Sequence, residues 1–249
     1  KELAVMCASH YGEDFHRETV TEILTKIGLN KEFLMCGSVS SLSEDIALLQ
    51  AWYNQKPDPL FNDCSGKHAG FLAICRKKGY SVSDYLEAKH PVQQEVLETI
   101  SNVCQYPKEK IKLGIDGCSV PVHAMPLFNM ALGYARLAKP DNFQSDLEEA
   151  SETVFNAMNQ HPEMIAGTNG FCSELIRNTN GKLIGKIGAE GIYCIGLKSE
   201  GIGIALKLED GSMSRIPPVV MKILKDLNVL TKNELNSLKK YLLALNIPN

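Results

Sequence analysis

Small and polar residues gather in four short segments of the chain. These are C-A-S-H-Y-G-E at 7–13, D-C-S-G-K-H-A-G at 63–70, D-G-C-S-V-P-V-H at 116–123 and G-K-I-G-A-E-G at 185–191. Each segment borders the expected end of a helix or strand, where functional groups usually collect. The four segments are therefore the candidates for a functional site.

Two of these segments could together bind a metal ion. Cys64 and His68 are four residues apart at the start of an expected helix, so both side chains can face one point. Cys118 and His123 are five residues apart across a proline-containing loop. Thiolate and imidazole are ligands that zinc prefers, and Lys67 could also reach inward. The alternative is a set of unrelated polar residues at turns.

Serine residues in the same segments are candidate nucleophiles. A serine hydroxyl is weak until a base takes its proton, and a lysine with a lowered pKa can do so. Ser9, Ser65 and Ser119 are the candidates. Lys186 and Gly188 form K-x-G at the end of an expected strand, a pattern that borders the site in Ser/Lys acyl-transfer enzymes. An exposed lysine at a strand end is the alternative.

Other polar residues could bind substrate or act as a base. His10 and His16 are candidate general bases, and Glu13, Glu174 and Glu190 are candidate carboxylates for an amino group. We assign substrate binding to His10, Glu190 and Gly188, because glycine lets a substrate approach the backbone. Glu190 lies between small residues in G-A-E-G, so a plain turn carboxylate is its alternative role.

The elements that must position these residues change along the chain. Helical spacing of apolar residues predicts a helix that ends at Gly28, one capped by Ser43, and others at 67–78, after Pro91, at 126–138 and at 145–160. Residues 182–187, 192–198 and 202–208 predict a three-stranded antiparallel meander. Pro217 opens a helix, and Thr231 with Glu234 forms a capping box for the last one. Helices followed by strands predict an α+β fold, as one domain over 1–249 or as a helical lobe and a sheet lobe with a cleft between them.

Composition excludes several classes of protein. Among the 249 residues, 26 are Lys or Arg and 29 are Asp or Glu, which gives no basic excess for nucleic acid binding. No apolar run approaches the roughly 20 residues that cross a bilayer. The eight cysteines form no C-x-x-C pair, which favours a reducing, cytoplasmic location over secretion with several disulfides.

The motifs of this sequence, and their order along the chain, resemble those of the rhizobial-type L-asparaginases, also called the asparaginase II family. The matching motifs are C-A-S-H-x-G-E, C-S-G-K-H-A-G, H-P-V-Q-Q, D-G-C-x-x-P, A-M-x-x-H-P-E-x-x-A-G, K-x-G-A-E-G and G-I-A-L-K-x-x-D-G. The resemblance runs from residue 3 to about 215. It implies a fold like that of serine β-lactamases and glutaminases, an amidohydrolase that converts asparagine to aspartate and ammonia, and a homodimer.

The resemblance also implies roles for particular residues. Cys64, Lys67 and Cys118 match the zinc-binding positions, and Asp116 matches a residue next to that site. Ser9 and Lys186 match a Ser–Lys pair in which lysine serves as base. A neutral lysine ligand needs a lowered pKa, which a bound cation would supply. We expect Ser9 and Lys186 to lie within a few ångströms of each other, since a base acts at hydrogen-bond distance.

The sequence also departs from the family pattern. Asp63 stands in place of Asn, Ser119 in place of Gly, and residues 168–174 lack an expected Arg and Asp. Family members carry a second Ser–Lys pair, S-x-x-K, upstream of the position where this sequence begins. We expect a chain that starts at Lys1 to bind zinc but to hydrolyse asparagine poorly. The alternatives are a zinc-hydroxide amidase in which Ser9 only binds, and a non-catalytic protein that binds an amino acid or zinc.

Overall fold

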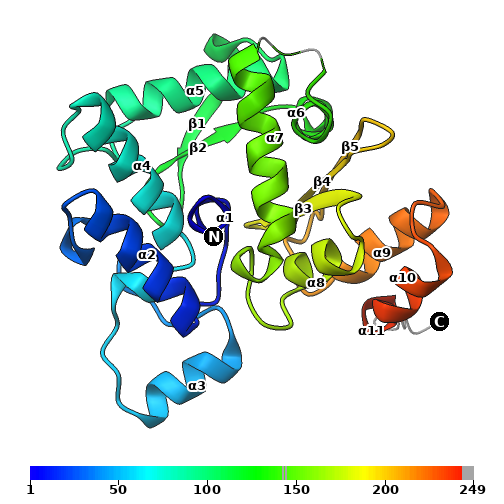
Figure 1. Ribbon diagram of the computed structural model, residues 1–249, viewed down its shortest axis with the longest axis horizontal. Coiled ribbons are helices and arrows are strands. Elements are labelled where there is room, and N and C mark those ends of the chain that lie inside the picture. The colour runs from blue at the N-terminus through cyan, green and yellow to red at the C-terminus, as the bar shows by residue number, and fades with distance from the viewer. Residues whose placement is uncertain (142, 144, 243–249) are drawn as a thin grey trace. The chain divides into compact units, whose positions relative to one another are not determined.

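A computed structural model describes the chain except for residues 142, 144 and 243–249 (Figure 1). The chain folds into two compact units. Unit 1 comprises Lys1–Met125 and Glu163–Thr168, and unit 2 comprises Pro126–Pro162 and Asn169–Asn249. Mixed helices and small antiparallel sheets confirm the α+β class. The β-lactamase-like or glutaminase-like arrangement and the single-domain organisation stay predictions.

Unit 1 consists of helices and one hairpin. The helices are α1 (Glu2–Met6), α2 (Asp14–Lys26), α3 (Glu44–Trp52), α4 (Ser65–Lys78) and α5 (Pro91–Cys104), with 3-10 turns at Lys31–Phe33, Pro59–Phe61 and Lys108–Lys110. Strands β1 (Lys112–Ile115) and β2 (Pro121–Ala124) pair antiparallel. The helix that ends at Gly28 and the one that begins at Pro91 are confirmed. Ser43 is the N-cap residue of α3, as predicted, although its side chain makes no capping hydrogen bond.

Close packing of α1 against α4 positions the candidate segments at 7–13 and 63–70. A Cβ on Gly66 of α4 would lie 2.1 Å from the carbonyl oxygen of Val5 in α1. Only glycine leaves room for two backbones at that separation. One turn later, a Cβ on Gly70 would meet only the flexible side chain of Met6, at 3.3 Å. The glycine in C-S-G-K therefore sets the distance between the two helices.

Unit 2 is a sheet covered by helices. Strands β3 (Leu183–Gly188), β4 (Ile192–Leu197) and β5 (Ile202–Lys207) form an antiparallel sheet in chain order, which confirms the predicted meander. The helices are α6 (Leu127–Ala138), α7 (Ser145–Gln160), α8 (Phe171–Asn178), α9 (Ile216–Asp226), α10 (Lys232–Ser237) and α11 (Lys239–Leu242). A 3-10 turn at Pro162–Met164 follows α7 and belongs largely to unit 1. The capping box of Thr231 and Glu234 is confirmed at the start of α10.

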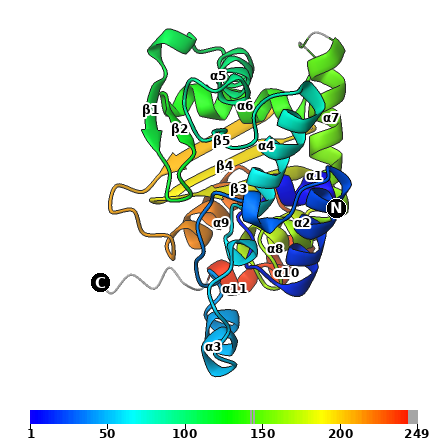
Figure 2. The same cartoon turned by 90° about the vertical axis from the view of Figure 1, so that its left-hand side faces the viewer.

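Alternation along the strands gives the sheet of unit 2 two different faces. On one face, Gly203 of β5 lies so close to α6 that a Cβ would stand 1.7 Å from the carbonyl oxygen of Ala131. On the other face, Tyr193 of β4 is fully buried and packs against Phe171 of α8, with ring centroids 5.5 Å apart. Figure 2 shows α6 and α8 on opposite sides of this sheet. Glycines on the α6 side therefore let helix and sheet backbones approach closely.

Candidate functional site

The segment at 7–13 leaves α1 in extended form and is held between two other segments of unit 1. The backbone N–H of Ser9 donates to the carbonyl oxygen of Ile165 at 3.0 Å. The next N–H, of His10, donates to the carbonyl oxygen of Asp63 at 3.2 Å. His10 is buried and Ser9 is half-buried. The motif that carries Ser9 is thus fixed by backbone pairing within one residue of Cys64.

The side chain of His10 adds a second link between these segments. Its Nδ1 accepts the N–H of Gly12 at 3.0 Å, and its Nε2 lies 2.9 Å from the hydroxyl of Ser65. Since Nδ1 is an acceptor, Nε2 carries the proton and donates to Ser65. His10 also stacks on His16, with ring centroids 4.8 Å apart. The structure places His10 in a buried hydrogen-bonded network, and its role in substrate binding stays a prediction.

Cys64 is held by the residues that precede α4. The side-chain amide of Asn62 donates to the carbonyl oxygen of Cys36 at 2.8 Å, while its oxygen accepts the N–H of Cys64 at 2.9 Å. Cys64 is the residue immediately before the first turn of α4, where the helix dipole favours a negative charge. The local fold therefore holds the Cys64 thiol at the N-terminal end of α4.

Cys118 lies in the tight connection between β1 and β2. The N–H of Asp116 donates to the carbonyl oxygen of Val120 at 2.9 Å. The N–H of Ser119 donates to the carbonyl oxygen of Asp116, also at 2.9 Å. Ser119 has a φ of 72°, in the left-handed region that favours glycine. This explains physically why the family pattern has glycine there. The turn buries Cys118 and leaves Asp116 half-buried.

Four polar side chains meet where α4 faces this turn. The ligand atoms of Cys64, Asp116 and Cys118 all lie within 4.8 Å of one another. One carboxylate oxygen of Asp116 lies 3.2 Å from Nζ of Lys67 and 3.2 Å from Sγ of Cys118. The structure therefore brings together the three residues predicted as metal ligands, with Asp116 at the centre of the group.

Electrostatics within the group favour one thiolate. A hydrogen bond from Cys64 is the largest effect on Cys118 and lowers the pKa of Cys118 to about 4, while the pKa of Cys64 is raised. Burial tends to lower the pKa of Lys67, but the charges of Cys64, Cys118 and Asp116 outweigh it and raise that pKa. Burial would raise the pKa of Asp116, yet the charge of Lys67 with hydrogen bonds lowers it. Asp116 is therefore a carboxylate and Lys67 an ammonium group.

This arrangement fits zinc. Zinc–sulfur bonds of about 2.3 Å in a tetrahedral site place two sulfurs about 3.8 Å apart, which is compatible with ligand atoms within 4.8 Å. Two thiols with a carboxylate or an amine form a donor set that zinc accepts. Lys67 could bind only after losing its proton, whereas Asp116 is already anionic. The fit therefore rests on Cys64 and Cys118 as two ligands. Asp116 and Lys67 are the candidates for the third ligand.

The remaining predicted residues occupy varied positions. His68 is buried on α4, and His123 is half-buried on β2, where burial and then the charge of Lys67 lower its pKa. In unit 2, Nζ of Lys186 on β3 donates to the carbonyl oxygen of Ile187 at 2.7 Å. Its pairing with Ser9 of unit 1 stays a prediction.

Two further predicted residues lie at the connection between β3 and β4. Gly188 ends β3, and a Cβ there would meet the side chain of Ile192 at 3.1 Å. Glu190, with a φ of 57°, and Gly191, with a φ of 76°, form the hairpin turn. The position of Glu190 matches its alternative role as a plain turn carboxylate. Substrate binding by Gly188 and Glu190 stays a prediction.

Sequence patterns give no signal for two residues near the cluster. Cys36 is buried, and burial raises its pKa to about 12, so it is a neutral thiol. Tyr85 is fully buried, with its hydroxyl 2.8 Å from Nδ1 of His68. Both lie outside the four polar segments and depend on tertiary folding to reach the cluster, so spacing could not have identified them.

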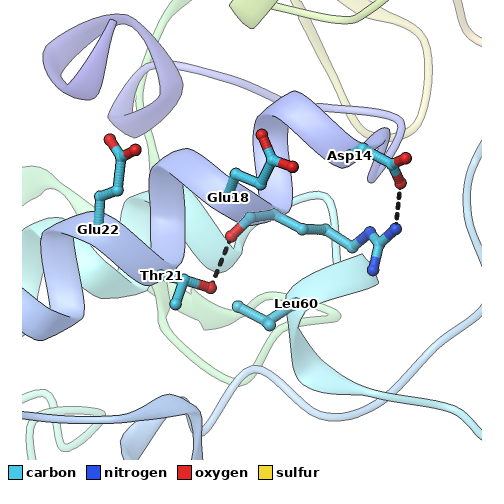
Figure 3. Close-up of a pocket in the computed structure, with 6 residues that line it drawn as sticks. Asp14, Glu18, Thr21, Glu22 and Leu60 are labelled. Atoms are coloured by element: carbon cyan, nitrogen blue, oxygen red, sulfur yellow. Dashed lines mark hydrogen bonds and ion pairs between the residues drawn. The ribbon is translucent and has the colours of Figure 1, made fainter.

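A surface hollow of about 600 Å³ lies elsewhere on unit 1. It is lined by Asp14, Arg17, Glu18, Thr21 and Glu22 of α2 and by Leu60 (Figure 3). Arg17 bonds Asp14 and stacks over the ring of Phe61, 4.4 Å from its centroid. The hollow contains none of the residues predicted for the site, so the cysteine cluster remains the candidate.

Together, the fold and the cluster define a mixed α+β protein with a thiol-rich metal-type site next to a serine-bearing segment. The chain belongs to the L-asparaginase II family, whose model matches residues 1–246. This membership confirms the resemblance carried by the motifs and indicates an amidohydrolase. A comparison with curated proteins gave no match. Within the described part of the chain, every helix is too short or too polar to span a bilayer.

Proposed function

We propose that this protein hydrolyses the side-chain amide of L-asparagine to give L-aspartate and ammonia. One observation carries the proposal for this member of the family. The serine segment is tied by His10 to Asp63 and Ser65, on either side of Cys64, within a single unit. A nucleophile and a metal-type cluster that share one rigid support are suited to act on one small substrate.

We infer that zinc binds through Cys64, Lys67 and Cys118. When bound, zinc would supply a Lewis acid that can polarise a substrate oxygen or a water. Lys67 must lose its proton to bind, and the carboxylate of Asp116 at 3.2 Å accepts a hydrogen bond from the remaining amine N–H. Asp116 therefore orients Lys67, and it is also the donor that would replace Lys67 if the amine stayed protonated.

Ser9 is the proposed nucleophile and Lys186 the proposed base. The oxygen of Ser9 attacks the amide carbon while its proton passes to the neutral amine of Lys186. Collapse of the tetrahedral intermediate breaks the carbon–nitrogen bond, and Lys186 returns the proton to the departing nitrogen as ammonia forms. Water then hydrolyses the ester, which releases aspartate and restores the Ser9 hydroxyl. His10, Gly188 and Glu190 are the proposed contacts for the substrate, and a homodimer is the proposed assembly.

Ammonia release by the complete natural chain, with any residues that precede Lys1, tests this function. We expect release from asparagine to exceed release from glutamine, and a loss of at least about 100-fold in Ser9→Ala. Ser81→Ala, at an exposed serine, is the matched control and should keep full activity. Absence of ammonia from asparagine in the wild type would contradict the proposal.

The same assay distinguishes the Ser–Lys mechanism from that of a zinc-hydroxide amidase. In that mechanism a chelator would abolish turnover while Ser9→Ala would retain it, since the serine would only contact the substrate. In the Ser–Lys mechanism, Ser9→Ala abolishes turnover even with a full complement of zinc.

A further inference from the structure

Residues 163–168, here called the crossing segment, belong to unit 1 although the chain on either side of them belongs to unit 2. The crossing segment lies beside the serine segment. The N–H of Ser9 donates to the carbonyl oxygen of Ile165 at 3.0 Å, and the N–H of Tyr11 donates to the carbonyl oxygen of Ala166 at 2.7 Å. Because the chain leaves unit 1 at both ends of the crossing segment, contacts within unit 1 must keep the segment beside Ser9.

Glu13 holds the last residue of the crossing segment. One of its carboxylate oxygens accepts the N–H of Thr168 at 2.6 Å, and the other accepts the hydroxyl proton of Thr168 at 2.7 Å. The direction of both hydrogen bonds is fixed, because a carboxylate only accepts. Hydrogen bonds to a charged acceptor are roughly twice as strong as those between neutral groups. Glu13 therefore binds Thr168 through both of its oxygens.

His16 holds the first residue of the crossing segment. Its Nδ1 accepts the N–H of Glu13 at 3.2 Å, and its Nε2 donates to the carbonyl oxygen of Glu163 at 3.2 Å. A backbone N–H only donates and a carbonyl only accepts, so both contacts agree on a ring with its proton on Nε2. The start of α2 thus holds the crossing segment at both of its ends.

Gly167 shows how closely the two segments fit. Its φ is 135°, and a Cβ there would stand 2.3 Å from Oε1 of Glu13 and 2.9 Å from the side chain of Tyr11. A larger residue cannot occupy this position while Glu13 keeps its contacts with Thr168. The glutamate that ends C-A-S-H-x-G-E and the glycine that ends A-M-x-x-H-P-E-x-x-A-G therefore meet in space.

We propose that Glu13 is a positioning residue for Ser9. By binding Thr168, Glu13 keeps the crossing segment paired with the backbone of Ser9 and Tyr11, and this pairing holds the Ser9 hydroxyl where it attacks. Glu13 then acts through Ser9 and does not bind the amino group of the substrate, the role for which the sequence made it a candidate. The inference rests on the proposed function, in which Ser9 is the nucleophile.

Kinetics of ammonia release by the complete chain test this role. Glu13→Ala removes both acceptors and should lower kcat by about 10- to 100-fold, because a small misplacement of reacting atoms is costly. KM should change by less than about 2-fold, since the groups that contact the substrate remain. Glu13→Gln keeps an oxygen for the N–H of Thr168 and should recover most of kcat. Glu18→Ala, at an exposed glutamate of the same helix, is the matched control and should keep full activity.

Thr168→Val separates this contact from the start of α2, where Glu13 is the N-cap residue. The substitution removes the hydroxyl and keeps the N–H, so kcat should fall by about 3-fold. In the Glu13→Ala background the same substitution should have no further effect, because the acceptor is already absent. Unchanged kcat in Thr168→Val, or full additivity of the two substitutions, would overturn the inference. Thr168→Val also carries the test alone if Glu13→Ala does not fold.

Hydrogen exchange without substrate separates this inference from the proposed function. Protection of the amides in a peptide spanning 7–13 should fall by about 10-fold in Glu13→Ala and recover in Glu13→Gln. Unchanged protection in Glu13→Ala would overturn the positioning role. A 10-fold or larger rise in KM at unchanged kcat would show that Glu13 binds the substrate, and would overturn it too. A wild type that releases no ammonia from asparagine would refute the proposed function, whereas the exchange result would still decide whether Glu13 holds the serine segment.

Discussion

Replacing Gly66 by alanine tests how the fold places the serine segment beside the cysteine segment. A Cβ at this position would lie 2.1 Å from the carbonyl oxygen and 2.7 Å from the carbonyl carbon of Val5. Close contacts between carbon and a carbonyl oxygen are ordinarily about 3.3 Å or longer. Helix α1 must therefore move by about 1.2 Å from α4, and the segment that carries Ser9 begins at the end of α1.

The expected magnitude follows from two opposing effects. Overpacking in a core costs about 1–3 kcal/mol, and a backbone atom cannot rotate away, so the upper end applies. Alanine returns up to about 1 kcal/mol of helix propensity. The net loss for Gly66→Ala is about 2 kcal/mol. Gly70→Ala gains the same propensity on the same helix and meets only the side chain of Met6 at 3.3 Å, so it should be neutral or stabilising by up to about 1 kcal/mol.

Urea unfolding, followed by circular dichroism, measures both variants. The two alanine variants should differ by about 2–3 kcal/mol in their free energy of unfolding, with Gly66→Ala the less stable. Gly66→Ala should also reduce ammonia release in folded protein, since the serine segment is displaced. Equal stability of the two variants would refute the idea that contact between α1 and α4 requires glycine at position 66.

Three other predictions concern backbone conformation and burial. Ser119→Gly relieves about 1–2 kcal/mol of left-handed strain and restores some unfolded-state entropy, so thermal unfolding should show a net gain of about 0.5–1 kcal/mol. Burial chiefly lowers the pKa of His16 from 6.5 to about 4, so its stabilisation is present above pH 6.5 and is lost as the pH falls towards 4. Urea titration should show about 2 kcal/mol lost between pH 7 and 5 through this residue, and this part should be absent in His16→Gln. Gly203→Ala should cost more than about 3 kcal/mol or prevent folding of unit 2, because its Cβ would stand 1.7 Å from the carbonyl oxygen of Ala131; soluble, wild-type-like Gly203→Ala would contradict that packing.

Elements with regular apolar spacing could be predicted from sequence. The three strands of unit 2 alternate Ile and Leu with glycine-containing turns, and their bounds match the prediction to within one residue. The β1–β2 hairpin gave no such signal. Its strands have four residues each, Ile115 is exposed, and Pro121 opens the second strand. Short strands that bury little apolar surface carry no periodicity, so the segment at 116–123 was interpreted as a loop.

Helices α1 and α8 also escaped prediction, for the same kind of reason. Helix α1 has five residues, which is too few to show a repeating pattern of apolar residues. Helix α8 begins at Phe171 inside T-N-G-F-C-S-E, where small and polar residues obscure the buried face formed by Cys172, Leu175 and Ile176. Its burial comes from tertiary contact with the sheet, which a local pattern does not contain.

The residue types of the candidate site could be predicted from the sequence, but the arrangement of those residues in space could not. Cys64 and Cys118 stand out as thiols in polar segments, and the structure brings them together. The central position of Asp116 depends on the turn after β1, and the burial of His10 depends on contact with residues 163–168 and 62–65. Spacing along a chain gives neither of these, because both arise from segments far apart in sequence.

Zinc content, by elemental analysis of the purified chain, tests the metal centre that anchors this account. We expect about one zinc per chain in the wild type, with zinc lost in Cys64→Ala and in Cys118→Ala. Cys36→Ala removes a buried neutral thiol near the cluster and should keep its zinc. Retention of zinc in both Cys64→Ala and Cys118→Ala, or no zinc in the wild type, would contradict the central claim.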